Sequence, residues 1–484
     1  MESKILINAV DTDECRIAKI KDNKLQEFHL ESATREITQG NIYKAVITRV
    51  EPSLQAVFVE YGGNRHGFLQ KQEIHNDYYL ADERSKITDL VSVDQELIVQ
   101  ITKDPIMKKG AMLTTNISLP GRYVVLMPGS TNCGVSRQIS SDRERARLNS
   151  IIEKLELPEG FGIIVRTAGE HATKTQLSKD INYLMRLWKE INKKATSESV
   201  PSLLYKERNL AVRTIRDYFS SDVTEILIDN LDIYREIKAF LSVISPKQID
   251  IVKLHKGAKP IFTKYQLEHQ IASVFENKVS LRSGGSIVIE QTEALVAIDV
   301  NSGKATSKKD IEHTALQTNL DAAEEVARQL RLRDMGGLIV IDFIDMREAK
   351  NRSQIENQLK IHLKDDKART KVGRISKFGL MEMSRQRIHP SIQFGSFTTC
   401  KHCKGKGIIL SVETLGLGFL RKLSLDTLKD DVSSITGKVP LDVADYLLNK
   451  KRSELLELEI RRGISISIDG DKTLIAGESK IICD

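Results

Sequence analysis

Three polar side chains in the C-terminal half of the chain come at the ends of apolar runs. The run ALVAIDVNSG at 294–303 carries Asp299 and Asn301, and the run GGLIVIDFIDM at 336–346 carries Asp342. Carboxylates are the ligands that Mg²⁺ takes in enzymes acting on phosphates, where the hydrated ion is held against the phosphate group. We therefore expect Asp299 and Asp342 to form part of a divalent-cation site.

A strand–helix–strand unit would bring these acids together. Between the two runs, apolar residues recur at spacings of three and four, which is typical of an amphipathic helix that packs on a sheet. They are Ile311, Ala315, Leu316, Leu320, Ala323, Val326, Ala327 and Leu330. The strands that flank such a helix run parallel and close together, so their acids should meet at one edge of the sheet. We expect Gly336 and Gly337 to end the helix.

A single acid at a strand end is by default a helix cap or an ion-pair partner. Two acids on adjacent strands of one unit, with Asn301 beside the first, put a cation site on an equal footing with those interpretations. The basic residues that follow form either a solvated face or a phosphate-binding surface, and their position after the acids favours the second. They are Lys364, Lys367, Arg369, Lys371, Arg374, Lys377, Arg385 and Arg387.

Short β-type runs between residues 37 and 115 predict a small barrel of the OB type. Such barrels bind single-stranded nucleic acid by stacking bases on exposed aromatic side chains, with Lys or Arg nearby for the phosphates. Phe58 lies in an alternating strand and fits either the core or the surface. Phe68 lies in the segment GNRHGFL, which resembles the nucleic-acid-binding S1 domain, and is therefore the better surface candidate.

Arg166 and Thr167 lie where the apolar strand 162–169 gives way to a turn. A guanidinium fork beside a hydroxyl group suits a terminal phosphate. The competing interpretation is a structural ion pair between Arg166 and a carboxylate, and position alone favours that interpretation.

Cys400 and Cys403 form a Cys-x-x-Cys turn in the segment TCKHCKGKG. A structural zinc ion needs four ligands, and the sequence has no second such pair. His402 lies inside the turn, where it is badly placed to join its neighbours. The residues alone leave three interpretations open: a redox pair, an inert pair, or half of a zinc site shared between two molecules.

Bulk composition excludes several classes of protein. The 484 residues are enough for several domains, and five cysteines are too few for a disulfide-stapled scaffold. No apolar run approaches the length of a membrane span, and no apolar leader follows a basic start. We therefore expect a cytoplasmic protein without a transmembrane segment. A net charge of +7 is compatible with nucleic-acid binding but does not establish it.

Three long motifs carry a resemblance to a known family. DVNSG, ARQLRLRDMGGLIVIDFIDM and KFGLMEMSRQR look like motifs of the ribonuclease E/G family of bacterial endoribonucleases. The similarity covers the chain from its start to residue 411 and, more loosely, the remainder. Because the sequence stops at residue 484 without a long scaffold tail, it resembles the short, ribonuclease G-like form, and we expect no segment for degradosome partners.

The resemblance implies an α/β multidomain fold. An RNase H-like subdomain is interrupted by an S1 β-barrel and a 5′-sensor region, and a DNase I-like catalytic α/β subdomain, a zinc-link and a small oligomerisation domain follow. The implied bounds are 1–36 and 212–274 for the RNase H-like subdomain, 37–115 for the S1 domain, 116–211 for the 5′-sensor region, 275–396 for the catalytic subdomain, 397–411 for the zinc-link and 412–484 for the small domain.

The same resemblance implies roles for particular residues. Asp299 and Asp342 match the magnesium ligands of the family, and Asn301 matches its neighbouring catalytic asparagine. The implied pocket for a 5′-monophosphate consists of Val125, Arg166 and Thr167. The implied RNA-binding residues are Phe58, Phe68, Lys109 and Arg369, the last by its motif Asp-Lys-Ala-Arg. The implied ligands of a structural Zn²⁺ shared between two protomers are Cys400 and Cys403.

The function that the resemblance implies is magnesium-dependent hydrolysis of single-stranded RNA by an endoribonuclease that favours 5′-monophosphorylated substrates. Its expected roles are rRNA and tRNA processing and mRNA decay. The expected assembly is a homodimer through the zinc-link, with a homotetramer as the larger form. The alternative is a non-catalytic S1-type RNA-binding or assembly protein, which would account for the barrel and the charge but not for the paired acids.

Overall fold

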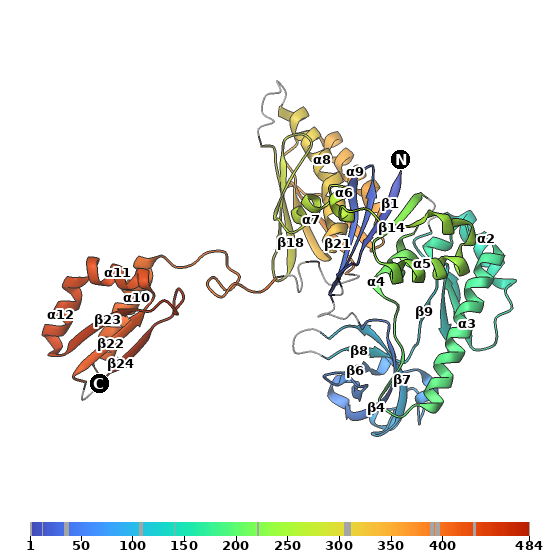
Figure 1. The fold of residues 1–484 in the computed structure, drawn as a ribbon, viewed down its shortest axis with the longest axis horizontal. Coiled ribbons are helices and arrows are strands. Elements are labelled where there is room, and N and C mark those ends of the chain that lie inside the picture. Colours follow the sequence, from blue (N-terminus) through green and yellow to red (C-terminus); the bar gives the residue numbers. More distant parts are fainter. Residues whose placement is uncertain are drawn as a thin grey trace. The chain divides into compact units, whose positions relative to one another are not determined.

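The computed structural model describes residues 2–11, 13–32, 38–105, 110–139, 141–219, 222–303, 311–387, 392, 397–428 and 432–483. The chain forms two compact units, Met1–Gln393 and Phe394–Asp484 (Figure 1). The expected multidomain α/β fold with a β-barrel is confirmed. Among the described helices, none combines the length and the apolar character that spanning a bilayer requires.

The first sheet joins the start of the chain to a segment about two hundred residues later. Its strands, in spatial order, are β15 (Val252–Leu254), β14 (Val223–Ile228), β1 (Ser3–Asn8), β2 (Glu14–Lys21) and β3 (Lys24–Ser32). Because β1 pairs in parallel with β14, everything between β3 and β14 is an insertion into this sheet. Alternate residues of β1 serve two cores: Ile5 and Ile7 pack with α4 (Leu210–Tyr218) and α5 (Leu231–Ile244), and Leu6 packs with α6 (Ile261–Lys264) and α7 (Glu268–Val274).

The inserted barrel is closed. Its strands are β4 (Ile42–Glu51), β5 (Ala56–Glu60), β6 (Gly67–Gln70), β8 (Met112–Thr114) and β7 (Glu96–Lys103), and β7 returns to pair with β4. Val57, Val59 and Leu69 point into the core and are fully buried. A later strand, β13 (Ser202–Tyr205), pairs with the first residues of β4 from outside the barrel. The predicted barrel is therefore confirmed, with one strand added from elsewhere in the chain.

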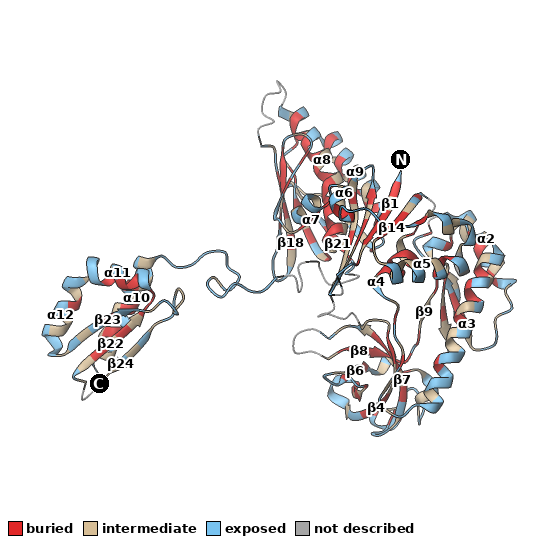
Figure 2. Cartoon of the chain, in the orientation of Figure 1, coloured by how far each residue is buried: buried red, intermediate tan, exposed pale blue. Residues whose placement is uncertain are grey.

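A smaller sheet follows the barrel. Its strands are β11 (Cys133–Val135), β12 (Phe161–Val165), β10 (Val124–Pro128) and β9 (Leu119–Pro120), and α2 (Asp142–Glu153) and α3 (Lys174–Ser197) pack on its core. Figure 2 shows the long α3 with a buried inner side and an exposed outer side. The strand that the sequence places at 162–169 ends at Val165, and a 3₁₀ turn at Thr167–Gly169 takes over.

The six-stranded sheet that carries the acids is called the acid-bearing sheet below. In spatial order it consists of β16 (Lys278–Ser280), β17 (Ser286–Gln291), β18 (Leu295–Asn301), β19 (Gly337–Asp342), β21 (Leu380–Arg385) and β20 (Thr370–Ile375). One apolar core joins one face of this sheet to α8 (Ile311–Leu332) and α9 (Ala349–His362) (Figure 1). The predicted end of α8 at Gly336 and Gly337 is wrong, because the helix ends at Leu332 and Asp334 makes the left-handed turn, with φ of +47°.

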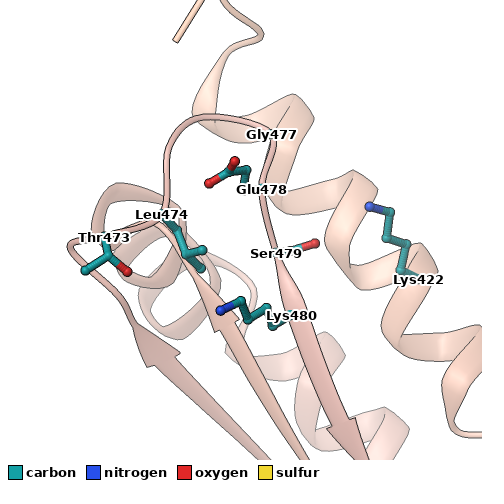
Figure 3. Close-up of a pocket in the computed structure, with 7 residues that line it drawn as sticks. All are labelled: Lys422, Thr473, Leu474, Gly477, Glu478, Ser479 and Lys480. Carbon is teal, nitrogen blue, oxygen red and sulfur yellow. The ribbon is translucent and has the colours of Figure 1, made fainter. Parts of the chain in front are cut away.

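The C-terminal unit contains a three-stranded sheet with helices. Its elements are α10 (Val412–Asp426), β22 (Ser434–Val439), α11 (Leu441–Lys450), α12 (Arg452–Arg462), β23 (Ser465–Gly470) and β24 (Lys480–Cys483). An open hollow of about 530 Å³ lies beside β24 (Figure 3). Its lining comprises Lys422, Thr473, Leu474, Gly477, Glu478, Ser479 and Lys480. None of these side chains is buried, so the hollow by itself indicates no ligand.

Candidate active site

Asp299 and Asp342 lie directly opposite each other on adjacent parallel strands. The register of β18 and β19 pairs Asp299 with Asp342, and neighbouring strands are about 4.8 Å apart. Both residues are exposed, whereas the alternate residues Ile298 and Ile341 point into the core. The acids therefore occupy the face of the acid-bearing sheet that the core does not cover. The strand–helix–strand arrangement that the sequence predicts for them is confirmed.

Asn301 is held against the first acid. Its side-chain Nδ2 donates a hydrogen bond of 2.6 Å to Oδ2 of Asp299. Residues two apart on a strand face the same side, which explains the contact. The bond fixes the Asp299 carboxylate and leaves its other oxygen available to a ligand.

The two carboxylates repel each other. Partial desolvation, together with the negative charges of Asp299 and Asp345, raises the pKa of Asp342 above its ordinary value. A bound cation would relieve that repulsion. Within the described residues no group of three or more His, Cys, Asp or Glu side chains is arranged around one metal position. Two carboxylates nevertheless fit Mg²⁺, which keeps several waters and takes one or two protein carboxylates beside substrate phosphates.

Arg166, Thr167 and Val125 come together on the smaller sheet. Val125 of β10 is opposite Ile164 of β12, and the backbone N–H of Arg166 extends the ladder by donating to Tyr123 O at 2.7 Å. Alternate positions place Val125, Ile164 and Arg166 on one face. Thr167 follows and is exposed.

The Arg166 side chain is an ion-pair partner in this structure. Its Nη2 donates to Oδ1 of Asp217 at 2.6 Å, and its Nη1 donates to Gly121 O at 2.6 Å. Although burial alone would raise it, the guanidinium groups of Arg216 and Arg166 hold the pKa of Asp217 well below its ordinary value. The structural ion pair is thus present, and two of the five N–H groups of Arg166 are used in these bonds.

Gln138 joins the cluster of Val125, Arg166 and Thr167 to the segment that precedes β20, the edge strand of the acid-bearing sheet. Its Oε1 accepts a hydrogen bond from Thr167 Oγ1 at 3.0 Å, and its Nε2 donates to Lys367 O at 2.5 Å. Lys367 in turn donates from Nζ to Asp217 O at 2.5 Å. Arg369, two residues later, is exposed, and its carbonyl accepts from Gln386 N at 2.9 Å.

Two half-exposed phenylalanines form a platform on the barrel. Phe58 and Phe68 are paired across β5 and β6, with ring centroids 5.8 Å apart at an interplanar angle of 63°. The guanidinium carbon of Arg49 lies 4.6 Å from the Phe58 ring centre. Since neither ring is fully buried, both suit base stacking, and Arg49 adds a positive charge. Lys109, the other sequence-predicted barrel residue, lies outside the described residues.

The Cys400–Cys403 turn presents two thiol groups. Backbone N–H groups of Gly407, Gly405 and Lys406 lower the pKa of the Cys403 thiol, which favours the metal-binding thiolate. Lys404 N donates to Cys400 O at 2.8 Å and closes the turn. Two thiol groups supply two of the four ligands of a tetrahedral zinc ion, so the pair fits a site completed elsewhere.

Sequence reasoning missed four residues of these sites: Asp217, Gln138, Asp345 and Arg49. Asp217 and Gln138 act through contacts with residues 51 and 229 positions away, which no local pattern indicates. Asp345 was visible as a second acid three residues after Asp342. Arg49 was visible as a basic residue on the strand beside Phe58.

Comparison with protein families gives three matches. A family model described as "Ribonuclease E/G family" matches residues 118–388, which is more than half of the chain. An "S1 RNA binding domain" model matches residues 36–105, and a model described as "RNase E/G, Thioredoxin-like domain" matches residues 399–482.

Individual relatives agree with these matches. The chain is 44% identical over 470 residues to Ribonuclease E of Haemophilus influenzae, covering 96% of this chain and 50% of that protein. It is 45% identical over 465 residues to Ribonuclease E of Escherichia coli, covering 95% and 44%. Ribonuclease G of Escherichia coli is 35% identical over 475 residues, covering 97% of both chains. The chain thus spans about half the length of these ribonuclease E relatives and nearly all of ribonuclease G.

Proposed function

Because this chain belongs to the ribonuclease E/G family, we propose that it is an endoribonuclease that cuts single-stranded RNA by magnesium-dependent hydrolysis. The pairing of Asp299 with Asp342 on the open face of the acid-bearing sheet is the observation that carries this proposal. In a protein that only binds RNA, two carboxylates at that position would repel the phosphates of the RNA.

In this proposal, Asp299 and Asp342 hold Mg²⁺, which when bound acts as a Lewis acid and stabilises charge that develops on the phosphate. Asn301 keeps the Asp299 carboxylate oriented through its 2.6 Å hydrogen bond. Water adds to phosphorus and the 3′-oxygen of the preceding nucleotide leaves with a proton, so the products carry a 5′-phosphate and a 3′-hydroxyl. Arg369 is exposed and supplies a positive charge for the RNA backbone.

The substrate preference in the proposal comes from two other surfaces. Phe58 and Phe68 hold single-stranded RNA by stacking, with Arg49 beside them. Val125, Arg166 and Thr167 bind a 5′-monophosphate. Three N–H groups of Arg166 are left for that phosphate after its two bonds to the protein.

The proposed assembly is a homodimer in which two copies of Cys400 and Cys403 complete one zinc site. The lowered pKa of Cys403 supports thiolate ligation, and a second copy is the simplest source of two more thiolates. The small C-terminal unit then supports pairing of dimers into a tetramer. We further propose a cytoplasmic location and roles in rRNA and tRNA processing and mRNA decay.

The test is cleavage of a 5′-monophosphorylated single-stranded oligoribonucleotide with and without Mg²⁺. We expect Asp299→Asn and Asp342→Asn each to lower kcat/KM by at least about 100-fold, since even outer-shell partners of a metal cost 10- to 100-fold. RNA affinity should persist in both variants. Glu293→Gln is the matched control, because Glu293 is an exposed acid in the turn at the other end of β18.

Normal turnover by either aspartate variant would refute the assignment of the metal site. A wild-type protein that binds the oligonucleotide but leaves it uncut in Mg²⁺ would instead identify an S1-type RNA-binding protein.

A further inference from the structure

The turn between β20 and β21 borders the paired acids. Leu380, the first residue of β21, is directly opposite Asp342 in the antiparallel register. Gly379 packs against Asp345, the next acid after Asp342, because a Cβ atom at position 379 would lie 3.1 Å from Asp345 Oδ1. The turn that precedes Leu380 therefore forms one wall of the proposed active site.

A phenylalanine at the tip of this turn is left in water. The Phe378 side chain is 85% exposed, more than any other described phenylalanine. An aromatic ring offers 150–250 Å² of surface for burial, and Phe378 contributes almost none of that to the fold. Its ring is thus left uncovered by the described residues of its own unit.

The turn holds the backbone of Phe378 in a defined conformation. Ser376 N donates to Leu380 O at 2.8 Å and Gly379 N donates to Ser376 O at 3.2 Å. Phe378 N donates to Ser376 Oγ at 3.2 Å, and Gly379 adopts φ of +81°. Three hydrogen bonds within the five residues 376–380 fix the backbone that carries the ring, which favours a binding role because the backbone gains little further order on binding.

The separation between Phe378 and Asp342 suits a nucleic-acid strand. Phe378 lies in the turn two residues before Leu380, which is directly opposite Asp342, so the Cα atoms of Phe378 and Asp342 are at most about 13 Å apart. A phosphate bound at the acids places the neighbouring bases within reach of a ring at that separation.

Charge around the turn favours nucleic acid over a protein partner. Lys371, Arg374 and Lys377 are exposed, and none of them forms an ion pair with another described residue. Apolar protein interfaces are depleted in such charges at their centre, whereas an aromatic ring among basic side chains is typical of single-strand binding.

We propose that Phe378 is a substrate-contact residue that stacks on a base next to the phosphate cut at Asp299 and Asp342. This inference rests on the proposed function and adds to it a determinant of where the strand is cut. The platform of Phe58 and Phe68 belongs to the barrel, so Phe378 would be a separate stacking position at the acids themselves.

The experiment compares full-length Phe378→Ala, Phe378→Tyr and Ile460→Ala with the wild type. Ile460 is a matched control, since its side chain is 76% exposed and lies on α12 of the other unit. Binding is measured without Mg²⁺, so that the RNA stays uncut, on a single-stranded RNA that carries 2-aminopurine at successive positions around the mapped cut. Cleavage rates and cut positions are measured on the matching unmodified RNA.

Stacking predicts a roughly 5- to 150-fold loss of affinity for Phe378→Ala, with recovery in Phe378→Tyr and no change in Ile460→Ala. Quenching of 2-aminopurine should occur in the wild type at one position beside the cut and be lost in Phe378→Ala. If the wild type cuts RNA and Phe378→Ala binds and cuts identically, the stacking role is wrong. A changed native mass with unchanged RNA affinity would also overturn it and identify a protein contact. Failure of the wild type to cut any RNA would instead contradict the proposed function.

Discussion

Replacing Arg166 by Gln decides between the two roles that this residue can have. The structure shows Arg166 paired with Asp217, and the proposed function adds a 5′-monophosphate to its partners. The structural role predicts a loss of stability, and the sensing role predicts a loss of discrimination between 5′-monophosphate and 5′-hydroxyl RNA. Arg166→Gln removes the charge and shortens the side chain but leaves a polar amide in its place.

The expected loss of stability is small. About a quarter of each side chain in the Arg166–Asp217 pair is exposed, and Asp217 keeps Arg216 as a partner at 3.2 Å. Because the carboxylate is not left alone, we expect a cost of about 1 kcal/mol, near the upper value for exposed pairs. A charge-assisted hydrogen bond to a phosphate contributes about 1.5–3 kcal/mol, which corresponds to a roughly 10- to 150-fold preference for the 5′-monophosphate.

The assay measures KM and kcat on one RNA with either 5′ end, together with urea unfolding of each variant. We expect Arg166→Gln to raise KM for the 5′-monophosphorylated RNA toward that for the 5′-hydroxyl RNA. Arg213→Gln, which breaks a 3.1 Å pair with Glu31, controls for loss of an arginine ion pair. An unchanged preference together with a stability loss of about 3 kcal/mol or more, the cost of breaking a buried pair, would refute the sensing role.

Acid should reveal the same ion pair. The pKa of Asp217 is lowered in the folded state, so the stability it contributes is present above the unfolded value of about 3.9 and is lost as the pH falls below it. The stability difference between the wild type and Arg166→Gln should therefore be largest near neutral pH and shrink below about pH 4.

Three more perturbations test the remaining surfaces. Phe58→Ala should weaken single-stranded RNA binding by roughly 5- to 150-fold in fluorescence anisotropy, because a stacking ring is lost, and an unchanged Kd would assign the ring to packing. Replacing Cys400 and Cys403 by Ser should remove bound zinc and halve the native mass of the dimer, whereas retention of both would exclude the shared site. Asp366→Ala should cost about 3 kcal/mol in urea unfolding, the lower value for breaking a buried pair, because Arg385, 3% exposed, loses its 2.7 Å bond to Asp366 but keeps Asp334 at 3.2 Å, and a loss below about 1 kcal/mol would contradict this.

The paired acids were predictable because their placement follows from one local rule. An amphipathic helix between two apolar runs forces a parallel crossover, so Asp299 and Asp342 had to end neighbouring strands. The sequence pattern could not predict that the two acids lie directly opposite each other, because the register of the two strands depends on how α8 packs in the core. The end of the helix was misplaced for a different reason. Glycine adopts the left-handed conformation most readily, so the sequence pointed to Gly336 and Gly337, but in the structure Asp334 adopts it.

The pocket around Arg166 could be predicted only in part. The sequence located Arg166 and Thr167 at a strand end, but their partners come from elements far away in the chain. Asp217 lies on α4, 51 positions after Arg166. Gln138 donates a hydrogen bond to Lys367, which is 229 positions later in the sequence. Nothing in the hydrophobic period of either segment encodes such contacts, because polar side chains on a surface are free of the packing rules that fix apolar ones.

The pairing of β13 with β4 determines how the RNA-binding barrel would behave as an isolated fragment. A fragment cut at residue 115 keeps the five strands that close the barrel but removes Ser202–Tyr205 from the start of β4. The backbone N–H and C=O groups there would become an open edge, which is a template for pairing with another chain. Self-association of such a fragment would reflect the missing strand rather than the behaviour of the whole protein. Fusing residues 202–205 back through a short linker should restore a monomer.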